Sequence, residues 1–186
     1  LQVFVVSIIF FTLQFFISMF IGDTGVGDSV FAGTCASLNT LGCMVGGLTF
    51  GFLYSKFKLS LIPFALCALG ACFVLEFFLQ DAICIAVTVA LAGFFWMLFM
   101  SFFFVRCTEI TPESKVATST AIVAIGLNIG GGLSSFVLMG LIDMTGMTAV
   151  GLWPVYGVVC IVIAVITGIY YATLRGKQTS TTPASE

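Results

Sequence analysis

Six long apolar runs, separated by short polar connections, constrain the fold of this sequence more than any other feature. They cover residues of about 1–21, 30–54, 59–79, 82–105, 116–142 and 149–174. Each run is close to the roughly 20 residues that an α-helix needs to cross a hydrocarbon core. With 60% hydrophobic and only 8% charged residues, the chain cannot cover a water-soluble globule with polar surface. The sequence therefore predicts an all-α integral membrane protein with six transmembrane helices.

Charged residues divide between the two sides of this arrangement. The basic residues all fall on one side: Lys56, Lys58, Arg106, Lys115, Arg175 and Lys177. The opposite side carries only acids: Asp23, Asp28, Glu76, Asp81 and Asp143. Lys and Arg are enriched in cytoplasmic connections, so both chain ends are predicted to be cytoplasmic, with the protein in a plasma (inner) membrane.

Composition also limits the chemistry that we expect of the chain. A net charge of -2 without a basic cluster argues against a nucleic-acid partner. There is no histidine, and the seven cysteines form no CxxC pair, so the sequence predicts neither a metal site nor a cofactor. No base is visible that could activate a Ser or Cys nucleophile, which argues against an enzyme.

The polar segment 175–186 is predicted to be a disordered cytoplasmic tail. Because the chain begins inside an apolar run, we expect a fragment that lacks its start.

Glycines recur at helical spacing inside two of the runs. The positions that we predict to serve helix packing or hinge motion are Gly42, Gly46, Gly47, Gly126, Gly130, Gly131 and Gly132. Pairs four residues apart let two helix backbones approach closely, either within one bundle or across a dimer interface. The three consecutive glycines of the fifth run also weaken the helix at mid-membrane, which is typical of a transport pathway.

Three carboxamides lie at mid-depth in the runs: Gln14, Asn39 and Asn128. From a rise of 1.5 Å per residue, Asn39 lies ~14 Å from the outer end of its helix and Asn128 ~18 Å from the inner end of its own. Each is costly there unless it is hydrogen-bonded. One interpretation is that they bind a neutral solute in a central cavity, and the other is that they hold helix to helix. Trp96, too deep for an interfacial residue, is either a cavity wall or packing bulk.

The second and fifth runs correspond to each other if runs one to three repeat as four to six with inverted topology. Asn39 and Asn128 are then rough symmetry mates, and glycines follow both. We therefore expect a 3+3 inverted repeat.

The six runs, the segment GFLYSKFK between the second and third, and the glycine-rich fifth run resemble one half of a major facilitator superfamily transporter. That family carries a Gly-x-Leu-x-acid-basic-x-Gly-basic signature at this turn. Gly51, Leu53 and Lys56 match it, whereas Ser55 replaces the acid and Lys58 the second glycine. This departure is typical of the weaker copy, so the chain resembles the C-terminal half of a twelve-helix carrier.

The resemblance implies an alternating-access carrier whose cavity is lined, in this half, by the first, second, fourth and fifth helices. Those helices carry Gln14, Asn39, Trp96 and Asn128. Lys56 is implied to form a cytoplasmic gate contact. The expected partners are a small organic solute, the lipid bilayer, and the missing N-terminal six-helix half or a second copy. The alternative is a membrane scaffold or assembly module that transports nothing and whose glycine pairs hold its partners.

Overall fold

The computed structural model describes residues 2–179, and the side chains of residues 2–173. Its α-helices are α1 (Gln2–Thr24), α2 (Ser29–Phe57), α3 (Leu61–Phe78), α4 (Ala82–Ile110), α5 (Val116–Thr145) and α6 (Ala149–Thr179). Two short 3-10 turns, η1 (Lys58–Ser60) and η2 (Glu113–Lys115), precede α3 and α5. No strand occurs among the described residues, so the prediction of an all-α chain is confirmed for them.

Local sequence signals set the ends of several helices. The carboxylate of Asp28 accepts a hydrogen bond of 2.9 Å from the backbone N–H of Phe31 at the start of α2. Asp81 accepts one of 3.1 Å from the N–H of Ile83 at the start of α4. Such caps satisfy N–H groups that have no partner in the first helical turn. α5 ends at Gly146, whose φ of 66° is a conformation that a glycine adopts without strain.

Most helices extend beyond the apolar runs that predict them, because polar residues continue the helix past each run. α4 reaches Ile110 and α5 reaches Thr145. α6 continues to Thr179, into the segment 175–186 that the sequence predicts to be disordered. No proline follows the apolar run before Pro183 to stop the helix. Residues 1 and 180–186 lie outside the described part of the chain.

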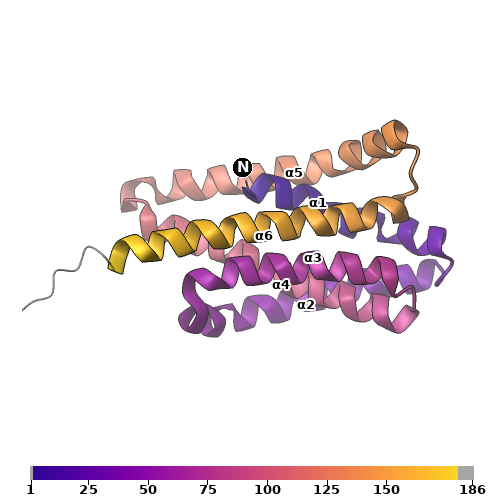
Figure 1. Ribbon diagram of the computed structural model, residues 1–186, viewed down its shortest axis with the longest axis horizontal. Helices are drawn as coiled ribbons and strands as arrows, with labels where there is room; N and C mark the ends of the chain where they lie inside the picture. Colours follow the sequence, from indigo (N-terminus) through magenta and orange to yellow (C-terminus); the bar gives the residue numbers. More distant parts are fainter. Residues whose placement is uncertain (1, 180–186) are drawn as a thin grey trace, which may run out of the picture.

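The helices form one bundle in which three pairs make most of the contacts: α1 with α5, α2 with α4, and α3 with α6 (Figure 1). α3 also packs on α4, and smaller contacts join α1 to α2 and α6, and α4 to α5. Successive helices run in opposite directions. As a result α1 and α5 are parallel, α2 and α4 are parallel, and α3 and α6 are antiparallel.

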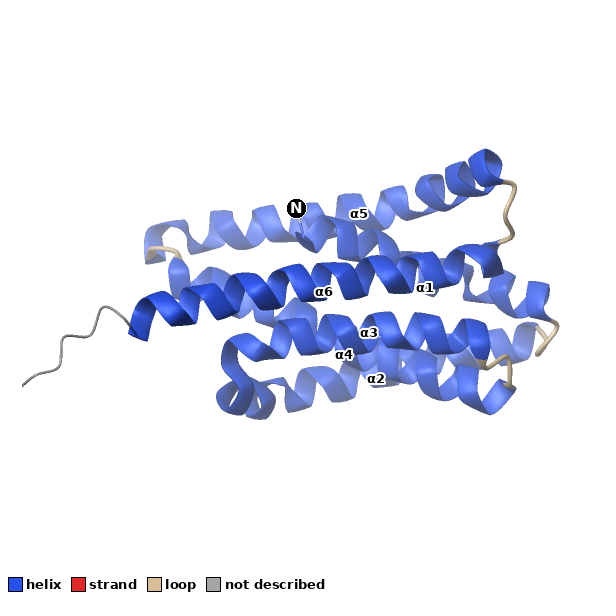
Figure 2. Cartoon of the chain, viewed as in Figure 1, coloured by secondary structure: helices blue, strands red, loops and turns tan. Residues whose placement is uncertain are grey.

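The connections gather at the two ends of this bundle (Figure 2). Residues 25–28, 79–81 and 146–148 form short loops at one end, which we call the acidic end because Asp23, Asp28, Asp81 and Asp143 lie in or beside these loops. The opposite end, which we call the basic end, holds the α2–α3 turn and the α4–α5 connection. The basic residues with described side chains are all there: Lys56, Lys58, Arg106 and Lys115.

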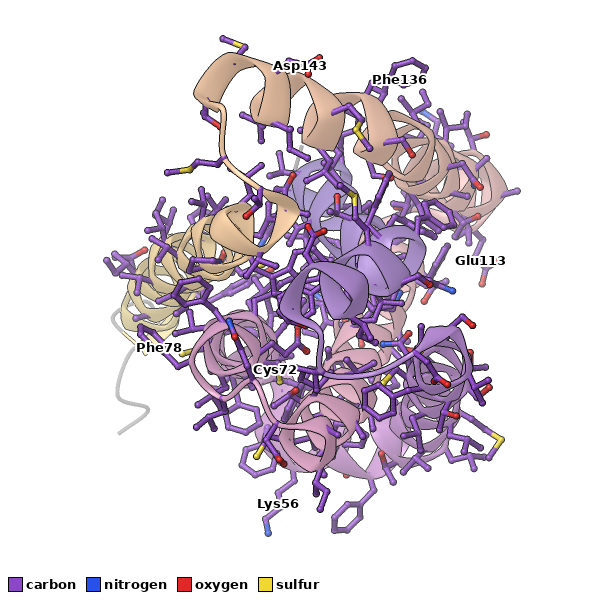
Figure 3. All side chains as sticks on the ribbon, turned by 90° about the vertical axis from the view of Figure 1, so that its right-hand side faces the viewer. Lys56, Cys72, Phe78, Glu113, Phe136 and Asp143 are labelled. Carbon is purple, nitrogen blue, oxygen red and sulfur yellow. The ribbon has the colours of Figure 1, made fainter. Side chains whose placement is uncertain are left out.

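Aromatic side chains fill the centre of the bundle, and others cover its outside. Trp153 is fully buried, with ring centroids of Phe20 and Phe73 at 4.7 and 5.8 Å. Phe136 and Phe78, in contrast, are 74% and 70% exposed and point away from the bundle (Figure 3). Large apolar groups at the periphery suit a surface that faces lipid rather than water.

Five helical segments among the described residues are long and apolar enough to cross a membrane. One of them, Ser29–Phe78, contains both α2 and α3, because η1 joins the two helices without a loop. The chain turns back at Lys58, whose φ is 47°. α2 and α3 therefore run in opposite directions instead of forming one long rod, and both pack mainly on other helices, α4 among them (Figure 1).

Candidate functional site

Asn39 lies at the contact between α2 and α4. Its side chain is buried, and Nδ2 donates a hydrogen bond of 3.0 Å to the carbonyl oxygen of Val89 on α4. Gly93, on the same helix, faces the backbone of Asn39 so closely that a Cβ there would meet the Asn39 carbonyl oxygen. The carboxamide therefore joins two helices in this structure.

The glycines of α2 that face α4 make the same close approach possible. A Cβ on Gly46 would lie 2.5 Å from the carbonyl oxygen of Phe94, and one on Gly42 would meet the carbonyl oxygen of Ala90. Gly47 is less restricted, since the nearest atom to its Cβ position is the end of the Met97 side chain at 3.6 Å.

α5 packs against α1 through Gly130 and Gly131. A Cβ on Gly130 would lie 2.7 Å from the carbonyl oxygen of Phe4, and one on Gly131 would lie 2.9 Å from the ring of Phe11. Gly126 and Gly132 point elsewhere, because no atom lies within 4 Å of their Cβ positions. One face of α5 thus packs against α1, and the glycines on its other face have no close neighbour among the described residues.

Asn128 lies on this other face of α5. Its side chain is exposed, and Nδ2 donates 2.7 Å to the carbonyl oxygen of Ala124 one turn earlier in the same helix. Gln14 of α1 is exposed as well. The contact of Gly130 with Phe4 sets the register of the two parallel helices and places Gln14 about 18 Å nearer the acidic end than Asn128. Both carboxamides are therefore exposed, but they lie at different depths.

Trp96 of α4 is buried against α1. Its ring stacks on Phe10 with a centroid distance of 4.2 Å and an interplanar angle of 6°. Phe11 meets it edge-on at 6.0 Å. The indole fills the space between two helices in this structure, one turn of α1 from Gln14. Trp96 thus lies one helical turn from Gly93, which faces Asn39, and it stacks on Phe10, one helical turn from Gln14, whereas Asn128 lies on a different helix pair.

Gly51, Leu53 and Lys56 lie in the last turns of α2 at the basic end. Gly51 has no neighbour within 4 Å of its Cβ position, Leu53 is half-buried, and Lys56 is exposed. The Lys56 Nζ lies 5.8 Å from the ring centroid of Phe57, within the range of a weak cation–π interaction.

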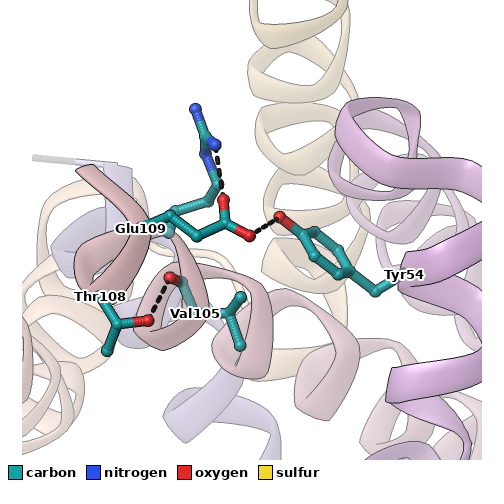
Figure 4. A network of polar contacts seen from close by, with 5 residues as sticks. Tyr54, Val105, Thr108 and Glu109 are labelled. Atoms are coloured by element: carbon teal, nitrogen blue, oxygen red, sulfur yellow. Dashed lines mark hydrogen bonds and ion pairs between the residues drawn. The ribbon is translucent and has the colours of Figure 1, made fainter.

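A polar network lies beside this segment (Figure 4). None of its residues is among the site residues predicted from the sequence. The Tyr54 hydroxyl donates 2.7 Å to Glu109 Oε1, and Arg106 Nη1 donates 2.6 Å to Glu109 Oε2. These bonds tie the end of α2 to the end of α4. A cavity of about 380 Å³ opens beside them, lined by Tyr54, Ser55, Lys58, Leu59, Arg106 and Glu109. The sequence offers no signal for this pairing, because Tyr54 and Glu109 are far apart in the chain.

The network predicts a small pH dependence of stability. The Tyr54 hydrogen bond, followed by that of Arg106, lowers the pKa of Glu109 from its ordinary value. A lowered pKa in the folded state adds stability above the ordinary carboxyl pKa, and this stability is lost as the pH falls through the lowered value. We expect Tyr54→Phe to cost about 0.2–1 kcal/mol at neutral pH and almost nothing once Glu109 is protonated. Unfolding of the detergent-solubilised protein at both pH values measures this, with Tyr170→Phe as the control. An equal cost at both pH values would contradict it.

Glu76 is a further residue that the site predicted from the sequence leaves out. It lies two residues before the end of α3, yet it is 1% exposed, and Trp153 of α6 donates 2.6 Å from Nε1 to its Oε2. In a helix, side chains lean toward the N-terminus, which here carries the carboxyl from the acidic end into the bundle. The apolar run LGACFVLEFF contains one acid, and this was the signal in the sequence that could have indicated a buried carboxyl. Its position near the end of a helix favoured an exposed side chain instead.

Comparisons of the chain with protein-family models, curated proteins and solved structures found no match.

Proposed function

We propose that the chain is one six-helix half of a secondary transporter that moves a small organic solute across a membrane by alternating access. The proposal extends the resemblance to the C-terminal half of a major facilitator carrier. It places both chain ends on the cytoplasmic side of a plasma (inner) membrane and a second six-helix unit, or a second copy, against this half.

The observation that carries the proposal is the pattern of helix packing. Exchanging α1, α2 and α3 with α4, α5 and α6 turns the α1–α5 pair into the α4–α2 pair and leaves the α3–α6 pair unchanged. The smaller contacts α1–α2 and α4–α5 also exchange, as do α1–α6 and α4–α3. Because successive helices alternate in direction, this exchange also reverses direction. Such packing is expected of a 3+3 inverted repeat.

The close-packed glycines follow the same exchange. Gly42 and Gly46 of α2 face the backbone of α4, while Gly130 of α5 faces the backbone of α1. Gly70 of α3 and Gly157 of α6 face each other, with Cβ positions 2.6 and 2.7 Å from the opposite carbonyl oxygen. Small residues at each contact let helices slide or rock against one another, which alternating access requires.

The proposal of six spans treats α2 and α3 as separate crossings. With 29 and 18 residues, the two helices are about 43 and 27 Å long. The shorter one still approaches the thickness of a hydrocarbon core, about 30 Å. The basic residues gathered at one end support a cytoplasmic position for that end.

Exposed polar groups on α1 and α5 support a face that is not turned to lipid. Gln14 and Asn128 are exposed on helices whose other exposed side chains are largely apolar. An exposed carboxamide at mid-membrane is costly against hydrocarbon. Because Gln14 and Asn128 lie at different depths, a water-filled cavity that reaches both residues removes that cost, with a polar solute beside one of them at a time.

Solute flux tests the proposal. We expect proteoliposomes that contain the full-length protein to take up at least one neutral solute from a broad panel. Asn128→Ala should abolish most of the flux while leaving unfolding unchanged, because its only hydrogen bond in the described structure is within its own helix. Ile129→Ala, also on the exposed surface of α5, is the matched control. Equal flux in the two variants would remove Asn128 from the pathway, and no flux of any solute in the parent would overturn the transport proposal.

The second candidate function is a membrane scaffold that transports nothing. The bond from Asn39 to Val89 favours it, because this carboxamide acts as helix glue in the structure. Under this alternative, Asn39→Ala should lower stability by about 0.6–1.7 kcal/mol, and no solute should move. A stable parent without flux, together with co-purification of a defined membrane partner, would support it.

A further inference from the structure

Glu76 is a buried acid for which neither the transport proposal nor the polar network at the basic end has a use. Its side chain packs at the junction of α3, α4 and α6, close to the acidic end of the bundle. It is only 1% exposed. Trp153, its hydrogen-bond partner, is fully buried between the rings of Phe20 and Phe73. Water is therefore excluded from both members of the pair in this conformation.

The two carboxyl oxygens of Glu76 have different surroundings. Oε2 accepts the 2.6 Å hydrogen bond from Trp153 Nε1, whereas Oε1 is buried without a hydrogen-bond partner among the described residues. An ionised carboxylate accepts hydrogen bonds at both oxygens, whereas a carboxylic acid accepts at its carbonyl oxygen and has a neutral hydroxyl at the other. A buried oxygen without a partner is less costly as part of a neutral acid than as part of a carboxylate. The asymmetry suits the acid form, with Oε2 as the carbonyl oxygen and Oε1 as the hydroxyl.

No positive charge faces Glu76 within the described part of the chain. The titratable side chains that interact electrostatically with Glu76 are the thiols of Cys35 on α2 and Cys72 on α3. α4 contributes the hydroxyl of Thr88, and α6 contributes the indole of Trp153. The described Lys and Arg side chains lie at the opposite end of the bundle. A negative charge at this site would be both desolvated and unpaired, which is strongly unfavourable.

We propose that Glu76 and Trp153 form a proton-binding site, in which Glu76 is a neutral carboxylic acid at neutral pH. Trp153 donates to its carbonyl oxygen, and the proton is on Oε1. Release of the proton to water leaves a carboxylate, which requires water to reach the site. Because the site lies at the junction of α3, α4 and α6, water enters when these helices separate at the acidic end.

Proton binding and helix separation are therefore linked. The closed acidic end favours the protonated acid, and by reciprocity a bound proton favours the closed end. A transporter with this arrangement uses protons as the coupling ion, in this half of the carrier. This last step rests on the proposed transport function, whereas the proton site itself does not.

Infrared difference spectroscopy tests the site directly. The spectrum of the wild type minus that of Glu76→Gln should show, at neutral pH, the C=O stretch of a buried carboxylic acid, and this band should disappear when the pH is raised. Glutamine keeps the carbonyl that accepts from Trp153, so the variant should remain folded. Carboxylate bands in place of the acid band at neutral pH would overturn the proposal. The wild-type spectrum alone, followed with pH, decides the question if the variant does not fold.

Tryptophan fluorescence gives an independent readout, because the chain has only two tryptophans, Trp96 and Trp153. In a Trp96→Phe background, the emission of Trp153 should change in a single titration step that Glu76→Gln removes. A step that persists unchanged in the double variant would come from another group and would contradict the proposal.

Flux measurements separate the two proposals. If the acid band is present but no solute moves, the transport proposal fails and the proton site stands. If solute moves and its accumulation does not respond to a pH gradient, coupling through Glu76 is wrong. Accumulation that follows the gradient in the wild type, and becomes independent of it in Glu76→Gln, is the expected result.

Discussion

Gly42→Ala is expected to destabilise the protein by about 1–3 kcal/mol. The added methyl group would meet the carbonyl oxygen of Ala90, and backbone atoms cannot turn aside as a flexible side chain can. α2 and α4 would have to separate, and the contact of Gly46 with Phe94 would loosen with them. Equilibrium unfolding in detergent micelles measures this loss.

Gly126→Ala is the matched control, and it is expected to have the opposite sign. No atom lies within 4 Å of its Cβ position, and its φ is not positive. Alanine there replaces the least favourable non-proline residue for a helix and should add up to about 1 kcal/mol of stability. Equal effects of the two substitutions would contradict the close approach of α2 to α4.

Trp153→Ala is expected to cost about 3–5 kcal/mol. The indole is fully buried, so its removal leaves a large cavity between Phe20 and Phe73. The change also removes the only hydrogen-bond donor of Glu76 Oε2 in the described structure. Both effects act at the contact of α3 with α6, which we expect to loosen first on heating.

Trp153→Phe separates the two effects. Phenylalanine restores most of the buried volume but donates no hydrogen bond, so its cost should fall well below that of alanine. In the Glu76→Leu background, where no acceptor remains, Trp153→Phe should cost less than in the wild type. A cost of Trp153→Phe that is the same in both backgrounds would show that the hydrogen bond contributes nothing to stability.

The positions of the helices could be predicted from the sequence because each apolar run is close to the length of one helix. The division of charge also predicted which connections share an end of the bundle. The pairing of the helices could not be predicted in the same way. Apolar residues surround most of each helix, so no stripe in the sequence marks the face that becomes buried. The glycine pairs of the second helix indicate a close contact, but α4 as its partner emerges only from the fold.

The candidate site was less accessible to sequence reasoning. A carboxamide at mid-depth can bind a solute or a neighbouring helix, and the sequence does not distinguish Asn39, bonded to Val89, from Asn128, bonded within its own helix. Glu76 and Trp153 are 77 residues apart, and no local pattern connects them. Depth along a helix is readable from residue counts, but the direction in which a side chain points depends on helices that are distant in sequence.

The short loops at the acidic end restrict how the proposed transporter can open. Residues 25–28, 79–81 and 146–148 are too few to fold over a solute as a flap. In the proposed transport cycle, a solute that enters or leaves at that end passes as whole helices tilt. The packed contacts between the helices then contribute to the free-energy difference between the closed and the open end. Mutations that retune opening should therefore lie in the helix crossings, at positions such as Gly70 and Gly157, far from any loop.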